Sequence, residues 1–242
     1  EITRCLVGSE MCIRDRLAFQ ERYNSGTSWT RNDFFEKNGY LLIRDLWDPE
    51  KLHSEPPTER GLYNYFGGST EHFHHEPVES QVEGSTARYW HPQYRRIHTG
   101  VRKKLETHLG RLLYNTYYYD RFYYPGQELK KHADRDACEI SVTIHCGTNL
   151  KGKSAKWPVW IKTPDIYTDK KKTDILVSGE NVSMILNPGD GMVYKGCERP
   201  HWRDPLEPPK RKTKGEAYYH QIFFHYVLQD GNRAHCAWDR SR

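Results

Sequence analysis

Three residues of this 242-residue chain have the types and positions that suit a metal ion: His132, Asp134 and, far downstream, His201. Residues two apart in an extended strand point to the same side, so His132 and Asp134 are expected to face one point. Two imidazoles and one carboxylate on one face of a metal leave positions open, as iron(II) needs when it binds both a co-substrate and dioxygen. Structural zinc would be closed by four ligands. The set therefore predicts an open iron(II) site.

The neighbouring stretches predict the elements that must position these ligands. Residues 123–126, Tyr-Tyr-Pro-Gly, predict a turn before His132, and the alternating run 140–145 predicts a strand after it. A strand, the Asn-Pro-Gly-Asp-Gly turn at 187–191 and a second strand lead to His201. A His-x-Asp tripeptide alone is weak evidence, and His-x-Glu forms also occur at 53–55 and 74–76. The order of turns and strands favours His132.

At this point the chain resembles a known family. His132-x-Asp134…His201 with these turns is similar to the iron(II)- and 2-oxoglutarate-dependent oxygenases of the prolyl-hydroxylase and phytanoyl-hydroxylase-like kind, and residues 33–43 resemble the N-terminal segment of that superfamily. The resemblance spans residues 29–228. It implies a mostly β fold with flanking helices around a double-stranded β-helix core, a cupin-like jelly roll.

The activity that this resemblance implies is hydroxylation of an unactivated carbon with release of succinate and carbon dioxide. It implies Fe(II) as the metal, 2-oxoglutarate and dioxygen as co-substrates, and ascorbate as a candidate accessory reductant. Halogenases of the superfamily lack the carboxylate ligand, so the presence of Asp134 disfavours halogenation. The resemblance does not specify the substrate.

The resemblance also implies a buried cation for the far carboxylate of 2-oxoglutarate, and arginine suits it because its guanidinium binds carboxylate in a bidentate manner. Relatives usually place this cation about ten residues after the second histidine. That window holds Arg211 and Lys212 in a Pro- and Lys-rich loop, and the following strand, 218–225, contains neither Arg nor Lys. This is a departure from the family pattern.

Arg203 is the preferred substitute, because it follows His201 by two residues and would face the same interior in a strand. Its alternative role is a surface ion pair. Tyr123 occupies the position where relatives often place a tyrosine that binds the same carboxylate, with plain core packing as its alternative. Gln221 or His220 would add a polar contact.

Length and composition predict one globular domain that is rich in aromatic residues. Residues 1–16 fit no element and are interpreted as a non-native or disordered leader. Residues 17–242 are expected to form a single oxygenase domain, with helical and irregular cover at 17–113 and the jelly-roll core at 114–242. Helices are expected at 33–38 and 94–114, and at least seven short strands after 114. Residues 58–95 and 163–181 are expected to be irregular.

Charge and cysteine content indicate which classes of partner and which compartment the sequence favours. The net charge of +5 is mild, and the lysine runs at 170–172 and 210–214 are expected to be solvated loops, with a rim for nucleic acid or an acidic substrate as the alternative. The longest apolar runs fall short of a membrane span. The six cysteines lack Cys-x-x-Cys spacing, which favours reduced thiols and a cytoplasmic location. A small-molecule substrate is favoured over a protein or nucleic acid.

Other functions stay open at this stage. A non-catalytic β-sandwich binding module would leave His132 and His201 as ordinary polar residues without specific iron affinity. A cupin-like protein or a zinc hydrolase could use the same three ligands, although a cupin would more often show two close histidines, a glutamate and a fourth histidine. His72, His74 and His75 form a second histidine group, which is more simply a polar loop because no partner ligand has suitable spacing.

Overall fold

The structure is a computed structural model that describes residues 30–65, 69–210 and 212–239. The leader expected at 1–16 and the candidate anchor Arg211 lie outside the described residues. The elements below belong to one compact unit that begins at Asn32.

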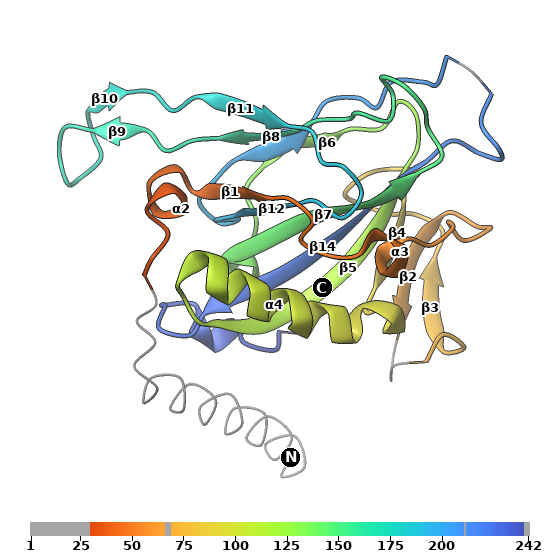
Figure 1. Ribbon diagram of the computed structural model, residues 1–242, viewed down its shortest axis with the longest axis horizontal. Coiled ribbons are helices and arrows are strands. Elements are labelled where there is room, and N and C mark those ends of the chain that lie inside the picture. Colours follow the sequence, from red (N-terminus) through yellow and green to blue (C-terminus); the bar gives the residue numbers. More distant parts are fainter. Residues whose placement is uncertain (1–29, 66–68, 211, 240–242) are drawn as a thin grey trace, which may run out of the picture. The chain divides into compact units, whose positions relative to one another are not determined.

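Two sheets form the core of this unit (Figure 1). The larger has eight strands, in spatial order β1 (Tyr40–Ile43), β12 (Gly191–Tyr194), β7 (Ile140–Thr148), β14 (Tyr219–Leu228), β5 (Leu113–Tyr123), β4 (Thr86–Tyr89), β2 (Gly61–Tyr65) and β3 (Phe73–Glu76). The smaller has β11 (Asn181–Met184), β8 (Val159–Lys162), β13 (His201–Arg203) and β6 (Leu129–His132). Neighbouring strands are antiparallel except β2 and β4. The jelly-roll prediction is confirmed.

The inner face of the large sheet is aromatic. Odd-numbered side chains of β5 share one face because strand residues alternate, and Tyr117, Tyr119 and Tyr123 on that face pack with Phe223 of β14 and Leu129 of β6. This cluster contains residues of both sheets, so it is the core between them. His132 and His201 lie on strands β6 and β13 of the smaller sheet.

The outer face of the large sheet packs against helix α4 (Arg95–Leu109), which lies across β5 and β14 in Figure 1. Its apolar side chains, Ile97, Val101, Leu105 and Leu109, recur at helical spacing and join the cluster that contains the even-numbered face of β14. The helix ends earlier than predicted because Gly110 adopts a left-handed conformation, with φ of 63°, that closes the last turn. The chain then starts β5.

The remaining helices are short. They are α2 (Asp33–Asn38), α3 (Pro49–Leu52) and the 3-10 turns η1 (Pro92–Tyr94), η2 (Asp136–Cys138) and η3 (Ala234–Cys236). The side chain of Asn32 accepts a hydrogen bond from the amide of Phe35 and so caps the start of α2. Gly39 ends that helix, whose bounds are the predicted 33–38.

Two segments are more regular than predicted. Residues 58–95 were expected to be irregular cover but contain β2, β3 and β4, which extend the large sheet beyond β5. The polar segment 163–181 contains β9 (Ile166–Tyr167) paired with β10 (Ile175–Val177). No helix in the described part of the chain combines the length and the apolar character needed to cross a bilayer.

Candidate metal centre

The structure brings His132, Asp134 and His201 together. Antiparallel pairing of β6 with β13 places His132 directly opposite His201, and their ring centroids lie 4.4 Å apart. The Nε2 atoms of both histidines lie 3.5 Å from Oδ1 of Asp134. One ligand atom from each residue lies within 4.8 Å of the other two. Three atoms at this spacing can surround one metal ion.

Backbone carbonyls fix the orientation of both imidazoles. Nδ1 of His132 donates to the carbonyl of Lys130 at 2.7 Å, and Nδ1 of His201 donates to the carbonyl of Arg199 at 3.0 Å. A carbonyl can only accept, so each ring carries a proton on Nδ1, which leaves Nε2 as the nitrogen that can bind a metal. Both Nε2 atoms face Asp134, so the metal-binding atoms of the two rings are directed at the carboxylate.

The second oxygen of Asp134 is also held. Oδ2 accepts a hydrogen bond from the Ser141 hydroxyl at 3.0 Å. The backbone amide of Asp134 donates to the carbonyl of Gly196 at 2.9 Å. A Cβ at Gly196 would lie 2.5 Å from Oδ2 and 2.7 Å from Ser141 Oγ, so this close approach requires glycine. Burial alone would raise the pKa of Asp134, but the charges of His201 and the hydrogen bond from His132 outweigh burial and lower it. The carboxylate is therefore ionised.

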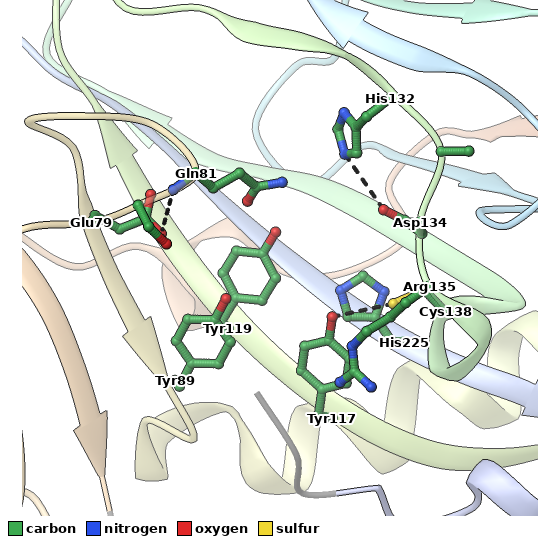
Figure 2. A pocket seen from close by; sticks show the side chains of 12 residues that line it. Glu79, Gln81, Tyr89, Tyr117, Tyr119, His132, Asp134, Arg135, Cys138 and His225 are labelled. Atoms are coloured by element: carbon green, nitrogen blue, oxygen red, sulfur yellow. Dashed lines mark hydrogen bonds and ion pairs between the residues drawn. The ribbon is translucent and has the colours of Figure 1, made fainter.

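A cavity of about 620 Å³ opens beside this triad (Figure 2). Its wall includes two of the three ligands, and its floor is formed by tyrosines of β4 and β5. The lining residues are Glu79, Ser80, Gln81, Tyr89, Tyr117, Tyr119, His132, Ala133, Asp134, Arg135, Cys138 and His225. A volume of this size suits a small organic molecule.

A polar layer lies on the side of Asp134 away from His132 (Figure 2). Ser141 Oγ lies 2.9 Å from Nδ1 of His225, and the Tyr117 hydroxyl lies 3.2 Å from Sγ of Cys138. Sequence reasoning missed these residues. For Cys138 and Ser141 the signal was the alternation of the run 138–146, which predicts an inner face but not which residues meet across it.

Arg203 is fully inside the protein, as predicted, with 2% of its surface exposed. Its Nη1 donates to the carbonyl of Trp157 at 2.6 Å, and its guanidinium lies 4.6 Å from the ring centroid of Trp157. Its Nη2 has no hydrogen-bond partner among the described residues. Burial lowers the pKa of Arg203, although Tyr219 and Tyr123 oppose this shift. The alternative of a surface ion pair is wrong, because the side chain is buried and bonds to a carbonyl.

The other candidate anchors are divided between the two faces of the large sheet. Tyr123 is buried on the inner face and interacts with Arg203. Gln221 is also buried, its Nε2 donates to Thr143 Oγ1 at 3.1 Å, and its Oε1 has no partner in the described ranges. His220 instead lies 2.7 Å from Asp120 in a buried cluster with Arg88, so the expected role of His220 at the anchor is wrong.

The second histidine group does not form a metal site. His74 lies 3.4 Å from Glu76, and His75 lies 3.7 Å from Glu59, at the surface. Within residues 30–65, 69–210 and 212–239, groups of three potential ligands occur only around Asp134: the triad, and Asp134 with Cys138 and His225. The polar-loop interpretation of the histidines at 72–75 therefore stands.

Several solved structures are similar to this one. The structure is similar to a prolyl-4-hydroxylase from Pseudomonas putida (TM-score 0.48, 13% identity, covering 80% of this chain and 95% of that one). It is also similar to a 2OG-Fe(II) oxygenase family oxidoreductase from Burkholderia pseudomallei (0.49, 9%, 80% and 87%). A third similar structure is a Trichoplax adhaerens prolyl hydroxylase in complex with a hypoxia inducible factor peptide fragment (0.47, 11%, 86% and 92%).

No protein-family model matches the sequence, and no curated protein matches it. At TM-scores of 0.47 to 0.49 and identities of 9% to 13%, these similarities carry no argument for function. The function has to be inferred from this chain's own side chains.

Proposed function

We propose that this protein is an iron(II)- and 2-oxoglutarate-dependent dioxygenase that hydroxylates an unactivated carbon. The observation that supports it most is the triad: two Nε2 atoms 3.5 Å from one carboxylate oxygen, with both Nδ1 protons committed to carbonyls. Two imidazoles, one carboxylate and an adjacent cavity form the donor set of an open ferrous centre. His132, Asp134 and His201 would hold the metal on one side and leave its cavity side accessible.

Bound there, iron(II) would supply the oxidising chemistry, in which dioxygen is activated as 2-oxoglutarate is converted to succinate and carbon dioxide. The chain positions the reactants. Ser141 holds the carboxylate through Oδ2, which leaves Oδ1 directed at the metal position. The aromatic core between the sheets excludes bulk water behind the triad.

Arg203 is proposed to bind the far carboxylate of 2-oxoglutarate. A buried guanidinium with an unpartnered Nη2 is unfavourable unless an anion pairs with it. Tyr123 and Tyr219 interact with Arg203 and would complete the pocket, with Gln221 on the same face of the sheet. The loop that contains Arg211 is the competing anchor.

Succinate production from 2-oxoglutarate, with iron(II) and ascorbate, tests the activity. The wild-type protein should form succinate even without added substrate, because such turnover needs only the metal, 2-oxoglutarate, dioxygen and the ascorbate that supplies the electrons the substrate would give. His132→Ala should reduce it to the protein-free rate, whereas His72→Ala, at an exposed position, should not. A wild-type rate equal to that of His132→Ala would favour the non-catalytic module.

Arg203→Met tests the anchor and retains much of the side-chain volume. It should raise the Michaelis constant for 2-oxoglutarate roughly tenfold to hundredfold, because hydrogen bonds to a charged group are worth about 1.5–3 kcal/mol. It should also stabilise the ligand-free protein, since a buried charge without a counterion is removed. If Arg203→Met leaves this constant unchanged and Arg211→Ala raises it, the anchor assignment is wrong.

A further inference from the structure

We infer that the cavity beside the triad binds an uncharged, hydrogen-bonding molecule that carries a flat or ring-shaped group. The inference rests on the proposed function only where it calls this molecule the substrate. The cavity volume of about 620 Å³ accommodates such a molecule with room to approach the metal position. The preference for an uncharged molecule and the preference for a ring-shaped group follow from separate observations.

The charged side chains of the wall are already neutralised by the protein. Glu79 is 2% exposed, and its Oε2 lies 3.1 Å from Nη2 of the fully buried Arg121. The same carboxylate accepts hydrogen bonds from the backbone amides of Gln81 and Val82, at 3.3 and 2.7 Å. Its charge therefore has a counterion and is not available to a cationic guest.

Arg135 lies on the side of the cavity opposite Glu79 in Figure 2 and forms an ion pair with Asp239. The third charged residue of the wall, Asp134, is also paired without a metal: Oδ1 lies 3.5 Å from Nε2 of His132 and of His201, and Oδ2 accepts from Ser141. An ionic guest would lose hydration on entering without meeting a counterion that is free to pair with it. A neutral guest avoids this loss.

Three tyrosines shape the floor. The rings of Tyr89 and Tyr119 lie 4.7 Å apart at an interplanar angle of 13°, and those of Tyr117 and Tyr119 lie 6.2 Å apart at 11°. Because the rings stack against one another, their edges and hydroxyl groups point away from the sheet, and the three hydroxyls point the same way in Figure 2. Ring edges favour the face of a guest π-system, and phenol groups both donate and accept hydrogen bonds.

Benzamide, benzoate and benzamidine test this inference because they share one shape and differ in charge. Each is titrated into the full chain with chelator present, so that no bound metal can attract benzoate. This also separates the result from the proposed iron site, whose failure would appear in the succinate assay. Benzamide should bind roughly tenfold more tightly than either ion.

Two pairs of variants show whether the benzamide is in this cavity. Gln81→Lys should shift the preference toward benzoate and Gln81→Glu toward benzamidine, since Gln81 lines the cavity at an exposed position. Tyr119→Phe should weaken the binding of benzamide about twofold to tenfold, because one hydroxyl group is removed. Tyr118→Phe is the matched control, because the neighbouring hydroxyl donates to the carbonyl of His91 on the other face.

Any of three results would overturn the inference. The first is that none of the three compounds binds the wild-type protein. The second is that benzoate or benzamidine binds as tightly as benzamide. The third is that Tyr118→Phe and Tyr119→Phe have equal effects, or that the Gln81 variants leave the order unchanged, since the compounds would then bind elsewhere.

Discussion

Asp134 has a different set of partners on each of its two oxygens. Oδ1 faces Nε2 of His132 and His201, and Oδ2 accepts from Ser141, which in turn contacts His225. Ser141 has one hydroxyl proton, and its nearby acceptors, Asp134 and the carbonyl of Cys138, cannot donate. Nδ1 of His225 must therefore donate to Ser141. This chain of hydrogen bonds fixes the carboxylate before a metal arrives.

Ser141→Ala removes the hydrogen bond to Oδ2 while leaving the three ligands in place. Iron(II) affinity should fall about tenfold to hundredfold, as is typical when a partner that orients a ligand is lost. Anaerobic metal titration measures it, and Ser183→Ala, at an exposed position of β11, is the matched control. Equal affinities for the two variants would show that Ser141 does not orient the carboxylate.

Gly196→Ala tests the close approach at the carboxylate. The new methyl group would lie 2.3 Å from the carbonyl oxygen of Cys138 and 2.5 Å from Oδ2 of Asp134, so one of them must move. We expect a loss of about 1–3 kcal/mol in the free energy of unfolding and weaker iron(II) binding. Gly215→Ala, with φ of 74° and open space around it, should lower stability without changing metal binding. Unchanged metal affinity in Gly196→Ala would contradict the packing argument.

At the scale of elements, pairing of β6 with β13 brings the two histidines of the proposed metal site together. The spacing of His132 and Asp134 and the turns before His201 were enough to predict that these three side chains meet. The register that sets His132 opposite His201 was not predictable, because it depends on how distant strands meet. The same limitation hid Tyr117, Cys138 and His225, which reach the site from separate elements.

The strands of 58–95 were missed for a related reason. Short runs such as Gly61–Tyr65 are flanked by glycines and histidines, and they become strands only because the edge of β5 is there to pair with β4. In contrast, α2 and the strand after the turn at 187–191, β12, were predicted closely, since a cap, glycines and a tight turn mark their ends locally. Local signals therefore predicted the elements, and tertiary pairing decided the rest.

A buried ionic cluster ties β4, β5 and β14 together on the outer face of the large sheet. Asp120 forms an ion pair with Arg88 and accepts from Nε2 of His220, and the Tyr94 hydroxyl lies 3.3 Å from it. Asp120→Asn would leave the Arg88 charge buried without its partner. The free energy of unfolding should fall by about 3–5 kcal/mol.

Urea unfolding measures this loss, and Asp174→Asn, at an exposed position of the β9–β10 hairpin, should change stability by less than about 0.5 kcal/mol. The Asp120→Asn protein should keep its iron(II) affinity if it folds, because the cluster lies on the face away from the triad. A change of less than about 1 kcal/mol would mean that the cluster is not structural.

At the scale of the whole molecule, the two faces of the large sheet differ in role. Its inner face carries the cavity and the buried Arg203, and its outer face carries α4 and the ionic cluster. Both faces bury histidines. Burial lowers the pKa of His98 to about 3 and those of His145 and His220 to about 4.

Because these histidines are buried, we expect the folded protein to lose stability in acid. In the unfolded chain each would take up a proton near its ordinary pKa of about 6.5, whereas the folded protein takes it up only near 3–4. The unfolded chain therefore binds more protons in this window, and stability should rise as the pH increases from about 4 to about 6.5. The slope should be roughly 1.4 kcal/mol per pH unit for each such histidine.

Urea unfolding in chelator across this pH range measures the slope. His98→Gln keeps an amide that can donate to the carbonyl of His225 and cannot ionise. The unfolded chain should then take up about one proton fewer than in the wild type, and the slope should fall by roughly 1.4 kcal/mol per pH unit. His108→Asn, on the exposed side of α4, is the control. An equal slope in the wild-type protein and His98→Gln would contradict the lowered pKa of His98.

The central claim is that His132, Asp134 and His201 hold one iron(II) ion that 2-oxoglutarate can reach. The most direct measurement is an anaerobic titration of iron(II) into the protein with 2-oxoglutarate present, following the visible absorption of a 2-oxo acid chelated to ferrous iron. The wild-type protein should saturate at one equivalent, and His132→Ala and His201→Ala should show no such band. A band that persists in both variants, or that is absent from the wild type, would contradict the account.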